Sequence, residues 1–241
     1  CALGLAQEGC RVVICSRDPA RIEAAAAQIR AETGAEVIGV AADVSREVEI
    51  ERLVSTCVAQ FGGLEIAVHN AGGPAHGAFD EISGEQWYQA FDLNLMSFTR
   101  LVQAVVPEMK KAGYGRILTI ASSSVKQPIP NLVLSNAMRT GILGLAKTLS
   151  RELAPHQILV NVIVPGRIAT ERVDQLDQNV AARTGQTPQA VRQASLHTIP
   201  LGRLGRPEEL ANLVTFLASA AASYITGAAI QVDGGMINAL Q

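Results

Sequence analysis

Ser122-Ser-Ser-Val-Lys-Gln-Pro-Ile-Pro-Asn-Leu-Val-Leu-Ser135-Asn-Ala-Met-Arg139 joins the end of a predicted strand to a long apolar helix. The strand, residues 116–121, is rich in β-branched side chains, and the helix continues to about residue 154. Asn70-Ala71-Gly72 upstream and Pro165-Gly166 downstream also follow short apolar runs directly. Small and polar residues behind several strands indicate that the carboxyl edge of a sheet carries a binding site.

Strands and helices alternate along the whole sequence. The predicted strands are residues 11–15, 36–41, 64–68, 116–121, 158–164 and 228–232, and helical patterns separate them. Alternation of this kind predicts parallel strands with right-handed crossovers. We therefore expect an α/β fold, with a single doubly wound, Rossmann-like sheet and helices on both faces, in one domain over residues 1–241.

Two segments stand apart from this pattern. Residues 1–9 have the pattern of the last turns of a helix closed by Gly9, so we expect a strand and a loop to precede Cys1 in the complete protein. Residues 167–206 are polar and helix-prone, and they follow the carboxyl end of a strand. Because ligands bind at that edge of open α/β sheets, this segment is predicted to be a substrate lid, the alternative being a surface helix pair.

The composition excludes several classes of function. The net charge is −2 and the Lys and Arg residues are scattered, which argues against a nucleic-acid partner. No apolar run has membrane-spanning length, no metal-ligand spacing is found, and no G-x-S-x-G hydrolase motif occurs. The four cysteines show no C-x-x-C pair and are expected to be reduced packing thiols in a cytoplasmic protein.

The ordered motifs resemble the short-chain dehydrogenase/reductase family, and within it the 3-oxoacyl-carrier-protein reductases. The resemblance runs from Cys1 to Gly235. The matching segments, in order, are Asp43-Val44, Asn70-Ala71-Gly72, Asn94, Ser122, Pro165-Gly166 with Thr170, Ile225-Thr-Gly and Val232-Asp-Gly-Gly. The resemblance implies an NAD(P)-dependent oxidoreductase that interconverts a carbonyl and an alcohol, with 3-oxoacyl compounds as one substrate class.

The resemblance also implies roles for individual residues. Asp43 and Val44 would contact the adenine of the cofactor. Asn70, Ala71 and Gly72 would line the adenosine ribose, and Pro165, Gly166 and Thr170 would hold the nicotinamide end. Ser122 and Asn94 would belong to the catalytic group. The glycine-rich loop that receives the pyrophosphate in this family would lie just before Cys1.

The chain departs from the family pattern at two catalytic positions. The family places a tyrosine thirteen residues after Ser122 and a lysine four residues later, and these positions hold Ser135 and Arg139. A phenol has a pKa of about 10 that neighbouring cations can lower, whereas a serine hydroxyl is a much weaker acid. Arg139 keeps the positive charge and can bind ribose hydroxyls, but it cannot exchange protons at neutral pH.

Three interpretations of residues 122–139 follow. Hydride transfer survives with Ser122 and Ser135 polarising a carbonyl while water or the substrate supplies the proton, which is the interpretation we favour. Alternatively the site binds nucleotide without turnover, as in a regulatory or scaffold protein. In the third interpretation the serine and arginine only pack. Tyr88, Tyr114 and Tyr224 are predicted to lie outside the site, so none of them replaces the missing phenol.

Cofactor preference is expected at the end of the second strand of the family fold, where an acid binds a 2′-hydroxyl and an arginine binds a 2′-phosphate. Here that strand ends in Ser16 and Arg17, and Asp18 is assigned to the following helix cap. We therefore predict NADP rather than NAD, with Arg17 as the phosphate ligand and Ser16 as a second donor, although NAD is not excluded.

The substrate is constrained less than the cofactor. The predicted lid carries the arginines Arg167, Arg172, Arg183, Arg192, Arg203 and Arg206, which would suit an acidic group. Acidic residues lie among them, so an ordinary charged helix face is the favoured interpretation. By resemblance we expect a homodimer or homotetramer that associates through the helices at about residues 85–112 and 132–154, with a small-molecule carbonyl or alcohol as substrate.

Overall fold

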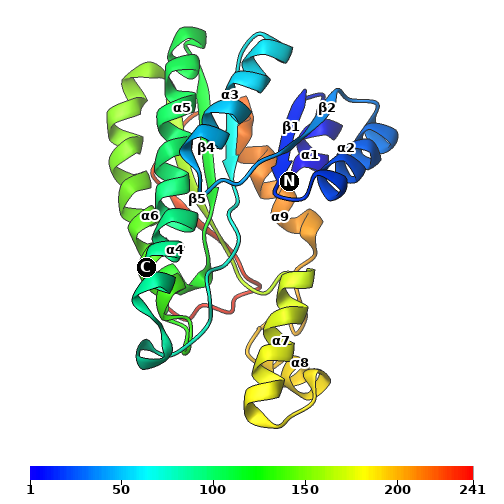
Figure 1. The fold of residues 1–241 in the computed structure, drawn as a ribbon, viewed down its shortest axis with the longest axis vertical. Helices are drawn as coiled ribbons and strands as arrows, with labels where there is room; N and C mark the ends of the chain where they lie inside the picture. The colour runs from blue at the N-terminus through cyan, green and yellow to red at the C-terminus, as the bar shows by residue number, and fades with distance from the viewer. Residues whose placement is uncertain (241) are drawn as a thin grey trace.

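The computed structural model describes residues 1–240 and shows an α/β fold in which every strand pair is parallel (Figure 1). The strands are β1 (Val12–Ser16), β2 (Val37–Ala41), β3 (Ile66–His69), β4 (Gly115–Ile120), β5 (Ile158–Pro165) and β6 (Ala229–Val232). All six predicted strands are confirmed. The α/β class predicted from the alternation of patterns is therefore correct.

Some of the nine helices of residues 1–240 begin at residues whose side chains cap them. The nine are α1 (Ala2–Gln7), α2 (Pro19–Thr33), α3 (Glu47–Phe61), α4 (Gly84–Ala90), α5 (Ser97–Ala112), α6 (Val133–Leu153), α7 (Glu171–Thr184), α8 (Pro188–Leu196) and α9 (Pro207–Ala218). Asp18 caps α2, because its carboxylate accepts the backbone N–H groups of the first turn, and Pro19 occupies the first helical position. Ser83 begins α4 through a capping box with Gln86.

The strands pair as two sheets, whereas the sequence predicted one continuous sheet. β1 pairs only with β2, and the second sheet has the order β3-β4-β5-β6. The inner edges of β1 and β3 border a cavity of about 550 Å³, lined by apolar residues such as Val13 and Val68. Pairing stops at this cavity because no other described strand lies between the two edges.

Helices cover both faces of the strands (Figure 1). On β4 the side chains alternate, so that Ile117 joins the core under α3, α5 and α6, and Leu118 joins the core under α1, α2 and α9. Both side chains are fully buried. Burial of each contributes about 1.5–3 kcal/mol to folding, and it fixes which residues of β4 face each layer.

Residues 167–206 form an appendage at the carboxyl end of β5. It holds α7 and α8, which extend away from the sheets in Figure 1. Asp177 of α7 is almost fully buried and forms ion pairs with Arg167 and Arg192, so the appendage has a charged centre of its own. Its role as a lid stays a prediction. Within residues 1–240, no helix has both the length and the hydropathy that crossing a bilayer requires.

Candidate active site

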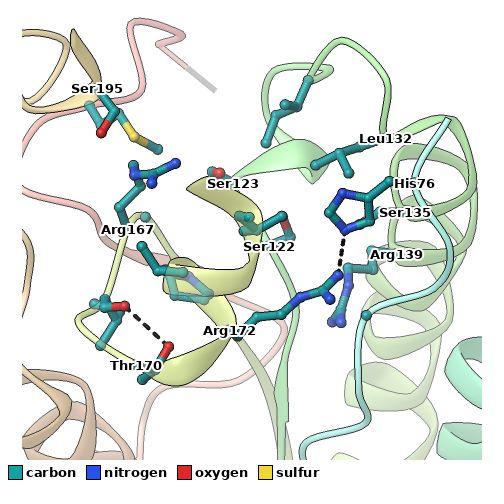
Figure 2. Close-up of a pocket in the computed structure, with 18 of the residues that line it drawn as sticks. His76, Ser122, Ser123, Leu132, Ser135, Arg139, Arg167, Thr170, Arg172 and Ser195 are labelled. Carbon is teal, nitrogen blue, oxygen red and sulfur yellow. Dashed lines mark hydrogen bonds between the residues drawn. The ribbon is translucent and has the colours of Figure 1, made fainter. Parts of the chain in front are cut away.

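A cavity of about 1910 Å³ opens where β3, β4 and β5 end, beneath α7 (Figure 2). Nine of the residues selected from the sequence line it: Asn70, Ala71, Gly72, Ser122, Ser135, Arg139, Pro165, Gly166 and Thr170. Seven of them end or follow strands, whose carboxyl ends lie at one edge of a parallel sheet, and Ser135 and Arg139 reach the same edge from α6. The location of the site at this edge therefore follows the sequence prediction.

The other selected residues lie outside this cavity. Ser16 ends β1 and donates its hydroxyl to Asp18 O at 3.0 Å, and Arg17 follows it. Val44 lines the 550 Å³ cavity instead. The proposed contacts of these residues with an adenosine or a 2′-phosphate stay predictions.

Asp43, after β2, has its carboxylate occupied by its own loop. It accepts Ser45 N at 3.0 Å and Ser45 Oγ at 2.7 Å. Burial raises the pKa of the Asp43 carboxyl, but these hydrogen bonds and the charges of Arg17 and Arg46 outweigh it, so the net pKa is lowered. A carboxylate held ionised in this way presents a fixed acceptor at the end of β2.

Asn94 lies behind the cavity wall in a π-helical segment, Phe91–Met96, between α4 and α5. Its Nδ2 donates to Gly72 O at 2.8 Å and so ties the loop after β3 to this helix. Its Oδ1 is buried without a hydrogen-bond partner among the described residues. A π-bulge and an unpaired buried acceptor are both features found at functional sites.

Three serines follow β4, and one of them, Ser124, contacts Ser135. Ser122 Oγ accepts Ser124 N at 3.1 Å, which leaves its own O–H free to donate into the cavity. Ser135 Oγ lies 3.5 Å from Ser124 Oγ. The hydroxyl partner of Ser135 is therefore Ser124, a residue that the sequence analysis did not select.

Arg139 of α6 acts as a clamp between strand ends. Its Nη1 donates to Ile120 O at 2.9 Å and Ala121 O at 3.0 Å, and its Nη2 donates to Ala71 O at 3.3 Å. Burial and the nearby charge of Arg172 lower the pKa of Arg139 from 12.5 to about 10, so it stays protonated at neutral pH. Arg139 thus holds the carboxyl ends of β3 and β4 together and keeps a positive charge beneath the cavity floor.

The end of β5 is held close to the C-terminal segment. A Cβ at Gly166 would lie 2.7 Å from Asp233 Cα, so only glycine fits this approach. Thr170 precedes α7, and its hydroxyl donates to Ile168 O at 3.2 Å. These contacts set the position from which α7 leaves the sheet edge.

No tyrosine lines the cavity within residues 1–240. Tyr88 and Tyr224 are exposed, and the hydroxyl of Tyr114 bonds to Ala218 O at 3.2 Å. The prediction that these residues lie outside the site is confirmed. The same residues contain no cluster of His, Cys, Asp and Glu that could hold a metal ion.

Arg172 and His76 form a hydrogen-bonded pair in the cavity wall that the sequence analysis did not predict. Arg172 of α7 donates from Nη2 to His76 Nε2 at 2.7 Å (Figure 2). They are 96 residues apart in the sequence. No local sequence pattern predicts a role for His76, and in the sequence Arg172 is one of several charged residues on a polar helix.

The family profile described as "Enoyl-(Acyl carrier protein) reductase" matches residues 1–237. The chain belongs to the short-chain dehydrogenase/reductase family. "Dehydrogenase/reductase SDR family member 4" of Homo sapiens is 37% identical over 232 residues, which is 96% of this chain and 80% of the relative. "3-oxoacyl-(acyl-carrier-protein) reductase FabG" of Staphylococcus epidermidis is 33% identical over 238 residues, 98% of this chain and 92% of the relative.

A solved structure supports the same assignment of this short-chain reductase. L-sorbose reductase from Gluconobacter frateurii, complexed with NADPH and L-sorbose, superposes with a TM-score of 0.94 at 32% identity. The match covers 99% of this chain and 91% of that protein. The resemblance drawn from the ordered motifs is confirmed, and with it the class of oxidoreductase that interconverts carbonyls and alcohols.

Proposed function

We propose that this short-chain reductase uses NADPH to reduce a small carbonyl compound of the 3-oxoacyl type, and that it also catalyses the reverse oxidation. The observation that carries the proposal is the meeting of Ser122, Arg139 and the Pro165-Gly166 turn on one cavity at the carboxyl edge of the sheet. Relatives that share most of the chain are named as reductases, and the superposed L-sorbose reductase holds NADPH.

The residues present fit the nicotinamide and ribose end of a dinucleotide. Arg139 retains Nε and one Nη2 hydrogen without an acceptor among the described residues, and both suit ribose hydroxyls. Asn94 would act indirectly, because its buried side chain lies behind the cavity wall and holds Gly72 O in place. Pro165, Gly166 and Thr170 would hold the nicotinamide, which supplies the hydride when the cofactor is bound. Arg17 would bind the 2′-phosphate.

The chain's own residues would prepare the carbonyl for reduction. Ser122 donates its free O–H to the carbonyl oxygen, because its lone pair already accepts Ser124 N. Ser135, which also lines the cavity, supplies a second hydroxyl. The fixed charge of Arg139 favours negative charge developing on that oxygen, and the proton comes from water in the open cavity. Loss of a tyrosine acid would slow the reaction by about 10²–10⁴-fold without abolishing it.

A non-catalytic nucleotide-binding or regulatory protein is the second candidate. The observation that favours it is the commitment of Arg139 to three backbone carbonyls, which makes the residue structural as well as charged. Ser135, moreover, is only 7% exposed. In this case dinucleotide would bind without turnover.

Turnover measured by nicotinamide absorbance with a panel of carbonyl compounds separates the two candidates. For the reductase we expect Ser122→Ala to lower kcat/KM by about 10²-fold, since one hydrogen bond to the developing alkoxide is lost. Ser55→Ala, on the exposed side of α3, is the matched control and should leave the rate unchanged. NADPH binding without turnover, with activity gained in Ser135→Tyr plus Arg139→Lys, would establish the regulatory candidate instead.

We further propose that the protein is cytoplasmic and forms a homodimer or homotetramer through the helical regions 85–112 and 132–154. Support comes from exposed apolar residues at the start of the first region, where Tyr88 and Phe91 are 75% and 40% exposed. Light scattering on the purified protein measures the assembly directly, and a monomeric mass at micromolar concentration would contradict the proposal.

A further inference from the structure

The wall of the large cavity carries more basic than acidic side chains. Four arginines line it, Arg139, Arg167, Arg172 and Arg183, together with His76 and His197. Among the described residues that line the cavity, none is Asp or Glu. An excess of arginines on a cavity wall attracts an anion, because the summed positive potential raises the local concentration of negative ligands.

Three of the four arginines already have partners, either a carboxylate or backbone carbonyl groups. Arg167 pairs with the buried Asp177, and Arg183 lies 3.5 Å from Glu81. Arg139 donates to three backbone carbonyls. Arg172 has no carboxylate partner within residues 1–240, and its one hydrogen-bonded side chain is the imidazole of His76. Arg139 and Arg172 are therefore the two arginines of the wall without a carboxylate partner among residues 1–240, and Arg172 has fewer of its N–H groups committed.

The guanidinium of Arg172 is held in a prepared position. Gly73 leaves room for it, because a Cβ at that residue would overlap the guanidinium. Arginine can only donate, so His76 Nε2 must be the unprotonated acceptor of the 2.7 Å bond. Burial, with the charges of Arg172 and Arg183, lowers the pKa of His76, which keeps the imidazole neutral and able to accept. The side chain is thus oriented by one hydrogen bond while its other N–H groups stay available.

Arg172 also lies at the reactive end of the cavity. Figure 2 shows it reaching from α7 toward His76 in the region of Ser135 and Arg139. The two guanidiniums are close enough for Arg172 to lower the pKa of Arg139, so they repel one another. An anion between them would relieve this repulsion. Arg17, the predicted ligand of the cofactor's 2′-phosphate, does not line this cavity.

We propose that Arg172 binds the carboxylate of an acidic carbonyl substrate, so that this short-chain reductase acts on oxo acids. The planar guanidinium matches a carboxylate in a bidentate arrangement, and one such contact orients the carbonyl of a short oxo acid toward Ser122. The inference rests on the proposed reductase function. It also predicts binding that does not require turnover.

Binding of paired ligands tests the inference without reference to catalysis. Acetoacetate and 3-hydroxybutyrate, each beside its methyl ester, are titrated into the protein by calorimetry, with and without NADPH. We expect each acid to bind about 10- to 100-fold more tightly than its ester, the range for hydrogen bonds to a charged group. Arg172→Met should abolish that preference, and Arg172→Lys should retain part of it because the charge remains.

Control variants and cofactor binding identify the anion. Arg203→Met, whose arginine pairs with Glu209 outside the cavity, should leave the preference for acids unchanged. NADPH affinity should change by less than about 3-fold in Arg172→Met, because a phosphate contact would cost far more. Equal binding of acid and ester, or loss of NADPH affinity alone in Arg172→Met, overturns the inference. Preference for acids without turnover preserves it and refutes only the reductase function.

Discussion

The imidazole of His69 makes the stability of this short-chain reductase depend on pH. His69, at the end of β3, is 4% exposed, and its ring nitrogens bond to Thr119 Oγ1 at 3.0 Å and Ser97 Oγ at 2.8 Å. Burial, and secondly the charge of Arg139, lowers the pKa of His69 from 6.5 to about 3. Below pH 6.5 the unfolded chain therefore takes up a proton that the folded chain excludes, so stability falls as the pH falls.

The lowered pKa of His69 sets the size of this change in stability. Each pH unit below 6.5 removes about 1.4 kcal/mol, so between pH 7 and pH 5 His69 alone should lower the free energy of unfolding by about 2 kcal/mol. Urea denaturation at both pH values measures the change. His69→Gln keeps one donor and one acceptor but cannot titrate. Between pH 7 and pH 5 its free energy of unfolding should therefore fall by about 2 kcal/mol less than that of the wild type.

Other groups titrate in the same range, and the comparison between variants removes their contribution. His156→Gln, at an exposed position, is the matched control and should follow the wild-type pH dependence. Parallel curves for wild type and His69→Gln between pH 7 and pH 5 would refute the reasoning, since they would show that the folded protein binds the proton as readily as the unfolded chain.

Two further substitutions test the supports of the site. Asp177→Asn removes the buried charge shared by Arg167 and Arg192. It should lower the stability of the appendage by about 1–3 kcal/mol, a limited loss because both arginines retain some exposure. Faster tryptic cleavage within residues 167–206 would report this loss, and unchanged cleavage would contradict it. Gly166→Ala places a Cβ 2.7 Å from the Asp233 backbone and should cost about 1–3 kcal/mol in urea denaturation. A change below about 0.5 kcal/mol would show that the turn gives way freely.

The fold was predictable because its signals are local. Short β-branched runs mark β1, β4 and β5, and an aspartate followed by proline fixes the start of α2. Parallel strands then place their carboxyl ends together, which is enough to assemble Asn70, Ser122 and Gly166 around one cavity. Neither step depends on knowing how any particular side chain packs.

The remaining features depend on contacts between distant segments. The bond from Arg172 to His76 joins residues 96 apart, and Ser124 contacts Ser135 only because α6 starts against the loop after β4. The neighbours of each strand in a sheet are likewise set by tertiary packing, because the apolar pattern of a strand does not name its partners. Such features emerge from tertiary packing, so residue pattern alone leaves them open.

The break between the two sheets also gathers every thiol of the protein. Cys1, Cys10, Cys15 and Cys57 all line the cavity between β1 and β3, and none forms a disulfide. Burial raises the pKa of the last three, so they are protonated at neutral pH and slow to react with electrophiles. Because all four cysteines are only partly buried, alkylation can proceed on the folded protein, and its rate should rise with pH as the thiols ionise.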